Sequence, residues 1–283
     1  SIRRFYIRRI LRIFPLYYLV LIFGFVFYHL ILPILKIPFD YDYNILDGVL
    51  LSTFFLPNVF TIMYDTGAIH QVLWSLGIEE QFYLLIAPLC YFLKKNNILK
   101  ALSVLTLIYF IIYHLDIVWF LKEYSFVYFF FFFGGLISVL EEKNLLNFLK
   151  SYKIIHIAIV ILTVAFYTTD IFEFKNIALR DITSCILLAL FIHTISFNNF
   201  GIQMKHRLLN YFGQISYGIY MYHMIVLNGV IFLFMYIDKL NILNDFFTII
   251  SINIMTFVLT LIISHLSYKY FETPFLKLKS KFR

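Results

Sequence analysis

Long apolar runs separated by short polar breaks make up most of the chain. The hydrocarbon core of a bilayer is about 30 Å thick and requires roughly 20 apolar residues per helix, so these runs have the length of membrane spans. Apolar residues occupy consecutive positions instead of every second one, which favours helices over the strands of a membrane barrel. We predict eight spans, near residues 13–32, 72–93, 98–115, 125–140, 153–169, 178–197, 212–237 and 245–268.

The longest polar break, 33–71, holds a short apolar stretch at 45–57. This stretch is too short to cross a bilayer, so we expect it to lie at the membrane interface or to re-enter the membrane. The sequence contains no long polar linker and no internal repeat. We therefore expect residues 1–283 to form one all-α membrane domain, a bundle of helices.

Composition and charge agree with a membrane location. Hydrophobic residues make up 62% of the chain and charged residues 14%, which excludes a water-soluble domain with an ordinary polar surface. If both termini are cytoplasmic, most of the 23 Lys and Arg residues fall in inner segments, as the positive-inside rule requires. Orientation and contacts with anionic membrane lipid thus explain the net charge of +7, and we expect no nucleic-acid partner.

The cysteines and most of the histidines suggest no chemistry. Cys90 and Cys185 lie inside predicted spans without the spacing of metal ligands, so we predict neither a disulfide nor a metal site. His70, His114 and His193 lie near the ends of predicted spans and have no distinctive sequence context.

Ionisable groups inside spans are the candidate functional residues, because each costs about 2.5–3.5 kcal/mol on insertion scales unless it faces a cavity or a partner. Arg8, Arg9 and Arg12 lie at the start of the first span. Arg8 and Arg12 are four residues apart and Arg9 and Arg12 three, so either pair can point the same way from one helical turn. Guanidinium groups suit phosphate oxygens. The alternative is that these arginines only anchor the helix at its inner end.

Two adjacent carboxylates occur in the segment WSLGIEEQFYLL, residues 74–85. Neighbouring side chains point about 100° apart on a helix, so Glu79 and Glu80 cannot both face one cavity equally. We expect one of them to bind substrate or take part in chemistry and the other to pair or cap. The alternative is that arginine, tyrosine or backbone groups satisfy both carboxylates.

Two further polar residues lie in the last two spans. His223 is near the middle of its span and is either a packed histidine or a proton carrier near neutral pH, with neighbouring tyrosines as hydrogen-bond partners. Glu272 lies at the inner end of the final span. An interfacial acid paired with Lys269 or with an early arginine is the simplest interpretation of Glu272.

Four segments in this order resemble the acyltransferase-3 family of bacterial membrane O-acyltransferases: FYIRRILRIFPLYY (5–18), WSLGIEEQFYLL (74–85), FGQISYGIYMYHMIV (212–226) and SYKYFETPFLKL (267–278). The resemblance extends over nearly the whole chain, and the second segment is the most specific. It implies an enzyme of the bacterial inner membrane that moves an acyl group, most often acetyl, from cytoplasmic acyl-CoA to a hydroxyl group. The acceptors in the family are glycans and glycosides, including lipopolysaccharide O-antigen, capsule and peptidoglycan.

The resemblance also implies roles for particular residues. Arg9 and Arg12 match the family's RxxR pair, which is thought to meet the phosphates of acyl-CoA, and Arg8 lies beside them. No cofactor other than this donor substrate is expected. The catalytic candidates are Glu80, Glu79 and His223. The substrate-binding candidates are Trp74, Ser75 and Tyr83, which match a segment that lines the family's central cavity, and Tyr217, which matches the family's ISYxxYLxH segment.

Members of the family typically have ten helices, so the eight spans predicted here leave two unaccounted for. The family's first helix usually carries the histidine regarded as the main catalytic base, and no residue before Arg3 can supply it. We therefore expect this sequence to be truncated at its N-terminus and this segment alone to lack its key base. Two alternatives remain, a non-catalytic remnant of the family and a transporter or flippase for a glycan or lipid-linked sugar. The sequence lacks the repeat symmetry and the paired broken helices that are typical of transporters.

Overall fold

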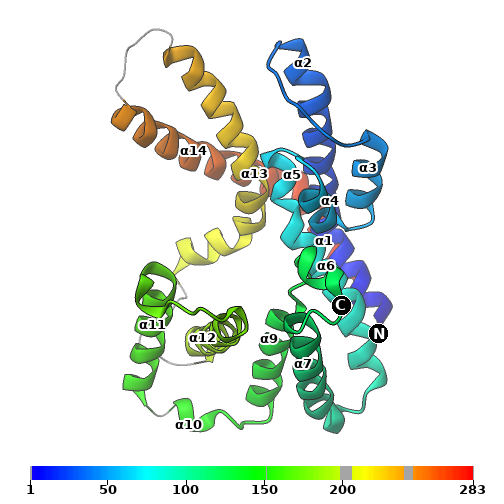
Figure 1. Ribbon diagram of the computed structural model, residues 1–283, viewed down its shortest axis with the longest axis vertical. Helices are drawn as coiled ribbons and strands as arrows, with labels where there is room; N and C mark the ends of the chain where they lie inside the picture. The colour runs from blue at the N-terminus through cyan, green and yellow to red at the C-terminus, as the bar shows by residue number, and fades with distance from the viewer. Residues whose placement is uncertain (1, 151, 198–205, 239–244, 283) are drawn as a thin grey trace. The chain divides into compact units, whose positions relative to one another are not determined.

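The computed structural model describes residues 2–150, 152–197, 206–238 and 245–282 (Figure 1). Within these ranges the chain forms helices and no strand, which confirms the all-α class of fold. The chain folds into two compact units. Unit 1 comprises Ser1–Gln81 and Lys205–Arg283, and unit 2 comprises Phe82–Met204.

Unit 1 combines the N-terminal and C-terminal segments of the chain. Its longest helices are connected to short helical turns, two of which are π-helical. Its elements are α1 (Ile2–Val26), the π-helix η1 (Phe27–Ile31), α2 (Leu32–Ile34), α3 (Ile45–Thr53), α4 (Pro57–Met63), α5 (Ala68–Gln71), the first part of α6 (Leu73–Phe92), α13 (Arg207–Asp238), α14 (Asp245–Ser267), the π-helix η4 (Tyr268–Glu272), α15 (Thr273–Lys279) and the 3-10 helix η5 (Ser280–Phe282).

Unit 2 contains the middle of the chain. Its larger helices form a row of packed neighbours. In this row α7 packs against α9, α9 against α12, and α12 against α11. Its elements are the second part of α6, the 3-10 helix η2 (Lys95–Asn97), α7 (Ile98–His114), α8 (Trp119–Glu123), α9 (Tyr128–Glu142), α10 (Asn147–Lys150), α11 (Lys153–Thr168), the 3-10 helix η3 (Asp170–Phe172) and α12 (Ile177–Phe197).

Five segments of the described residues are long and apolar enough to cross a membrane, which makes this a multi-pass membrane protein. The other three predicted spans are helical as well. However, α9 and α11 have only 15 and 16 residues, and α6 contains Glu79, Glu80 and Gln81. The number of eight spans therefore stays a prediction. The five segments are Ile2–Ile34, Lys95–His114, Ile177–Ser196, Arg207–Tyr236 and Asp245–Lys279.

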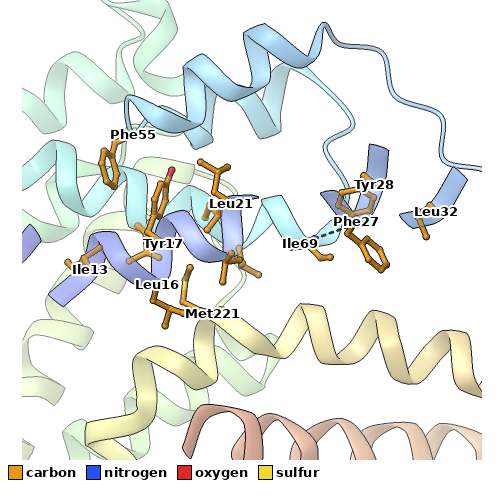
Figure 2. Packing of buried hydrophobic residues seen from close by; sticks show 14 residues of the cluster. Ile13, Leu16, Tyr17, Leu21, Phe27, Tyr28, Leu32, Phe55, Ile69 and Met221 are labelled. Carbon is orange, nitrogen blue, oxygen red and sulfur yellow. Dashed lines mark hydrogen bonds between the residues drawn. The ribbon is translucent and has the colours of Figure 1, made fainter. Parts of the chain in front are cut away.

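The core of unit 1 is built around α1. The side chains of Leu16, Tyr17 and Val20 are completely buried. The Tyr17 hydroxyl donates a hydrogen bond to the carbonyl oxygen of Ser52 at 2.7 Å, which joins α1 to the end of α3. Met221 of α13 lies beside Leu16 on another side of α1 (Figure 2). Helix α1 is thus the element on which the rest of unit 1 packs.

The segment between α1 and α6 also packs on α1, through a buried histidine. The imidazole nitrogens of His70 lie 3.0 Å from the carbonyl oxygen of Thr66 and 3.4 Å from that of Leu21. The ring lies directly against Gly24, where a Cβ atom would collide with Nε2. Its neighbours include Phe25, whose ring centroid is 4.4 Å away. The predicted interfacial stretch 45–57 lies in this same segment and forms α3 and the start of α4.

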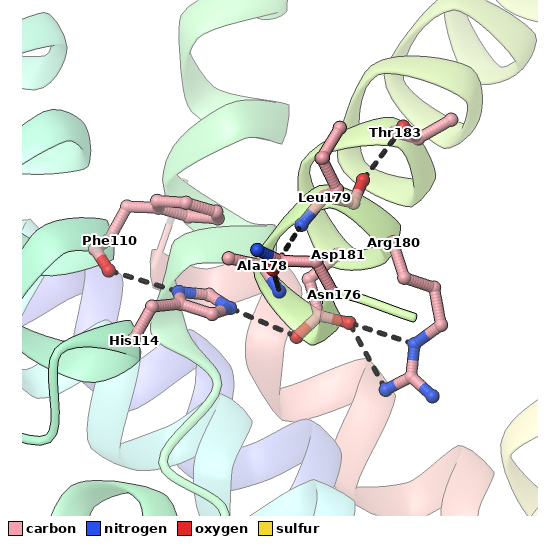
Figure 3. A network of polar contacts seen from close by, with 8 residues as sticks. All are labelled: Phe110, His114, Asn176, Ala178, Leu179, Arg180, Asp181 and Thr183. Carbon is pink, nitrogen blue, oxygen red and sulfur yellow. Dashed lines mark hydrogen bonds and ion pairs between the residues drawn. The ribbon is translucent and has the colours of Figure 1, made fainter. Parts of the chain in front are cut away.

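Unit 2 contains its own pairs of ionisable residues. His114, at the end of α7, has Nε2 3.2 Å from Oδ2 of Asp181 on α12 and Nδ1 3.0 Å from the carbonyl oxygen of Phe110 (Figure 3). The Arg180 guanidinium donates to the other oxygen of Asp181 at 3.3 Å. Buried polar groups require partners in a membrane protein. These contacts supply partners for the polar side chains of His114, at the end of α7, and Asp181, near the start of α12.

Substitution of Gly24 tests the contact between α1 and His70. Gly24→Ala places a methyl group where the imidazole lies, and we expect this overpacking to lower the free energy of unfolding by about 1–3 kcal/mol. The matched control is Gly229→Ala in α13, because a Cβ atom there meets no atom within 4 Å. The control should be neutral or stabilising, since alanine favours helix by about 1 kcal/mol over glycine. Thermal unfolding in detergent measures both variants, and equal stabilities for the two would contradict the contact.

Protonation of His70 should make unit 1 sensitive to acid. Burial lowers the pKa of His70 from 6.5 to about 4, although hydrogen bonding to the two carbonyl oxygens acts in the opposite direction. The unfolded chain therefore binds a proton that the folded chain does not, so stability is full above pH 6.5 and falls by roughly 3 kcal/mol as pH drops to 4. Unfolding measured across this range should show the loss in the wild type and in the exposed control His206→Gln. His70→Gln should have a flatter profile, and an unchanged slope would rule out His70 as its source.

Candidate active site

An ion pair joins the first helix of the chain to the helix that carries the adjacent carboxylates. Nε and Nη2 of Arg9 both donate to Oε1 of Glu80 at 3.4 Å. The two side chains are only 23% and 10% exposed. The Arg9 guanidinium also lies over the ring of Phe5, 5.8 Å from its centroid. The guanidinium group of Arg9 therefore makes its contacts within the protein.

Helical spacing explains why Glu80 faces α1. Leu73, Leu76, Gly77 and Glu80 occupy positions i, i+3, i+4 and i+7 of α6, which form one face of a helix. Leu73 and Leu76 belong to the core built on α1. Gly77 permits close packing on α4, because a Cβ atom there would come within 2.5 Å of Cδ of Pro57. Glu80 continues this packed face and is buried.

The same spacing explains why Arg9 and not its neighbours reaches Glu80. Arg9 continues the series Ile13, Leu16 and Val20, whose members are four, three and four residues apart and are buried. Arg8 and Arg12 lie beside this face and are exposed. Within the described part of the chain, neither Arg8 nor Arg12 forms a salt bridge.

Glu79 occupies a different position from Glu80. It is half-buried, and Arg9 and Arg12 both attract it electrostatically. The residues that the structure describes provide no hydrogen-bond partner for its carboxylate, whereas Glu80 is held by Arg9. The two adjacent carboxylates are thus divided into one that is fixed and one that is available to a ligand.

A third carboxylate enters the same region from the C-terminal segment. Glu272 is 7% exposed and lies in the π-helix η4. Tyr222 donates to Ser267 Oγ at 3.0 Å, and Ser267 donates to Oε1 of Glu272 at 3.2 Å. Arg12 also acts electrostatically on Glu272. Sequence interpretation placed Glu272 at an interface, but the structure buries it at the end of a hydrogen-bonded chain.

Tyr217 of α13 lies where these groups converge. Its hydroxyl donates to the carbonyl oxygen of Ile13 at 2.8 Å, which joins α13 to α1. The carboxylates of Glu272, Glu80 and Glu79 all act electrostatically on it. We call Arg9, Arg12, Glu79, Glu80, Tyr217 and Glu272 the charged centre.

A second group of predicted site residues lies further along α13. The Tyr220 hydroxyl donates to the carbonyl oxygen of Val72 at 2.7 Å, so Ser75 must be the donor in its 2.6 Å contact with the same hydroxyl. His223 binds the carbonyl oxygen of Tyr220 through Nδ1 at 2.6 Å. The described residues leave its Nε2 without a hydrogen-bond partner, so this nitrogen is available to exchange a proton.

The two remaining predicted residues, Trp74 and Tyr83, also lie on α6. Trp74 is 41% exposed, on the side of α6 away from the core. Tyr83 belongs to the part of α6 in unit 2, where its ring packs 6.0 Å from that of Phe82. The sequence did not predict the burial of Glu272. Its hydrogen bond with Ser267, five residues earlier, depends on the π-helical turn between them.

A helical membrane protein with three carboxylates and two arginines converging within one unit has the layout of a membrane-embedded enzyme or transporter. Comparison with protein families distinguishes these classes. A family model described as "Acyltransferase domain" matches residues 1–268. The chain therefore belongs to the acyltransferase-3 family and is a membrane acyltransferase, in agreement with the resemblance of its four segments. Comparisons with curated proteins and with solved structures found no match.

The ion pair between Arg9 and Glu80 can be tested by a double-mutant cycle. Arg9→Gln leaves a buried carboxylate without its cation, and we expect a loss of about 3 kcal/mol in the free energy of unfolding. Adding Glu80→Gln should recover much of this loss, because the uncompensated charge is removed. The exposed control Arg8→Gln should change stability by less than about 0.5 kcal/mol. Additive losses from the two substitutions at Arg9 and Glu80 would show that the side chains do not pair.

Proposed function

We propose that this acyltransferase transfers an acyl group, most simply acetyl, from cytoplasmic acyl-CoA to a hydroxyl of a cell-surface or exported glycan. The observation that carries the proposal is the charged centre, in which the exposed Arg12 and the partly buried Arg9 lie beside buried and half-buried carboxylates. The protein would lie in the bacterial inner membrane, with both ends of this chain in the cytoplasm, because the basic residues then obey the positive-inside rule.

The arginines have two different functions in this proposal. Arg9 is occupied by Glu80, so it positions the carboxylate instead of meeting a ligand. Arg8 and Arg12 are exposed, lie on one face of α1 four residues apart, and are suited to phosphate oxygens of the donor. The basic end of α1 therefore supports a donor that carries phosphate groups at the inner face.

The transfer requires a proton to move while an ester bond forms and the thioester bond breaks. The acceptor oxygen attacks the thioester carbon, its O–H bond breaks, the carbon–sulfur bond breaks, and the departing thiolate takes up a proton to give the free thiol of CoA. Glu79 is the candidate for holding the acceptor hydroxyl or orienting the base, since its carboxylate is available while that of Glu80 is held. His223, with Nε2 available, is the candidate within this chain for carrying the proton.

Replacement of Glu79 tests the proposed function in cells. Glu79→Gln keeps the size of the side chain and should reduce O-acyl transfer by about 100-fold or more, because positioned acid–base groups contribute 10²–10⁴-fold. Protein level and unfolding temperature should not change, since Glu79 makes no hydrogen bond with the described residues that the substitution would break. The readout is mass spectrometry of envelope glycans, before and after mild alkali, from cells with the complete gene, with the variant and without the gene.

The matched control is Glu123→Gln, which changes an exposed carboxylate of α8. Its glycans should carry the wild-type amount of alkali-labile groups. A Glu79→Gln strain with undiminished O-acylation would remove Glu79 from the mechanism. Identical glycans in cells with and without the gene would argue against an envelope glycan as the acceptor.

A further inference from the structure

The C-terminal segment of the chain lies against the basic start of α1. Three successive elements, η4, α15 and η5, each pack on α1, so the two ends of the chain come together within unit 1 (Figure 1). This segment is itself basic and ends in the sequence FLKLKSKFR. Folding therefore places cations that are far apart in the sequence side by side.

One of these cations, Lys279, joins the arginine cluster. Lys279 is half-buried at the end of α15, and Arg12, Arg8 and Arg9 all repel it electrostatically. The positive charge of Arg9 is balanced by Glu80. In the part of the chain that the structure describes, Arg8, Arg12 and Lys279 form no salt bridge with a carboxylate.

Three like charges held together favour a bound polyanion. Their mutual repulsion disfavours this packing, and a ligand with several negative charges would remove the repulsion. A lipid phosphodiester brings one negative charge, whereas the diphosphate and 3′-phosphate of CoA bring several. Arg12 also acts on Glu79 and Glu272, so the three cations adjoin the charged centre instead of lying on a remote surface.

We propose that Lys279 is the third cation, with Arg8 and Arg12, of a site that binds the phosphate groups of the CoA donor. The proposal rests on the proposed use of acyl-CoA and adds a residue from the opposite end of the chain to the donor site. Lys279 is a binding residue here and takes no part in bond exchange.

The test compares ligands with and without phosphate. CoA carries all the phosphate groups of the donor, and pantetheine carries the same thiol arm with none. Calorimetry on the protein in nanodiscs of phosphatidylcholine would give Kd for both ligands with Lys279→Ala, Lys279→Arg and the wild type. Lys279→Ala should raise Kd for CoA about tenfold, because one charged contact is lost. It should leave Kd for pantetheine unchanged. Lys279→Arg should stay within about twofold of the wild type for both ligands.

The matched control is Lys269→Ala, because Lys269 belongs to the same C-terminal segment but lies over the ring of Tyr270, 5.1 Å from its centroid. Its Kd for CoA should equal that of the wild type. A Lys279→Ala protein that binds CoA like the wild type would overturn the proposal, as would an equal weakening for CoA and pantetheine, which would indicate a general loss of structure. A wild type that does not bind CoA would instead overturn the proposed function.

A lipid headgroup is the competing source of phosphate, and a second arm of the experiment distinguishes it. The same variants would be purified with phosphatidylglycerol, and the lipid retained per protein would be measured by mass spectrometry. Loss of bound phosphatidylglycerol in Lys279→Ala together with unchanged CoA affinity would show a lipid site and contradict the proposal. Unchanged lipid retention with weakened CoA binding is the expected result.

Discussion

The neutralisation of charge inside a membrane domain is the constraint on which this structure depends. Glu80 belongs to the face of α6 that packs on α1, so its carboxylate is withdrawn from water and must meet a cation. Arg9 supplies that cation from the same face of α1. Because this pair is satisfied internally, the charge of Arg12 acts on the neighbouring Glu79 and on the third carboxylate, Glu272.

The packing of α1 makes this arrangement possible. Tyr17 ties α1 to α3 through a 2.7 Å hydrogen bond, and Tyr217 ties it to α13 through one of 2.8 Å. Both phenols bind backbone carbonyls, so they fix helix positions without using charged partners. Gln81 adds a 2.9 Å contact from α6 to Asn58 of α4. The charged centre is therefore held by a polar framework that a hydrophobic core alone would not provide.

Sequence patterns predicted the helical class, the positions of the helices and the family, because apolar run length and the four segments are local features. They also predicted that Glu79 and Glu80 could not both face one cavity equally, since adjacent side chains diverge on a helix. Which glutamate pairs with which arginine depends on how α1 packs on α6. The role of Glu272 depends on a π-helical turn, and the burial of His70 depends on close contact with Gly24, so neither could be predicted from local sequence.

The most direct test of donor binding at the inner face is to supply acetyl-CoA to sealed membrane vesicles of known orientation and to measure the release of the free CoA thiol. Donor binding at the basic inner face formed by α1 and α15 predicts thiol release in inside-out vesicles, where this face is accessible, and none in right-side-out vesicles. Release only from right-side-out vesicles, or from neither preparation of the complete protein with its glycan acceptor, would contradict it.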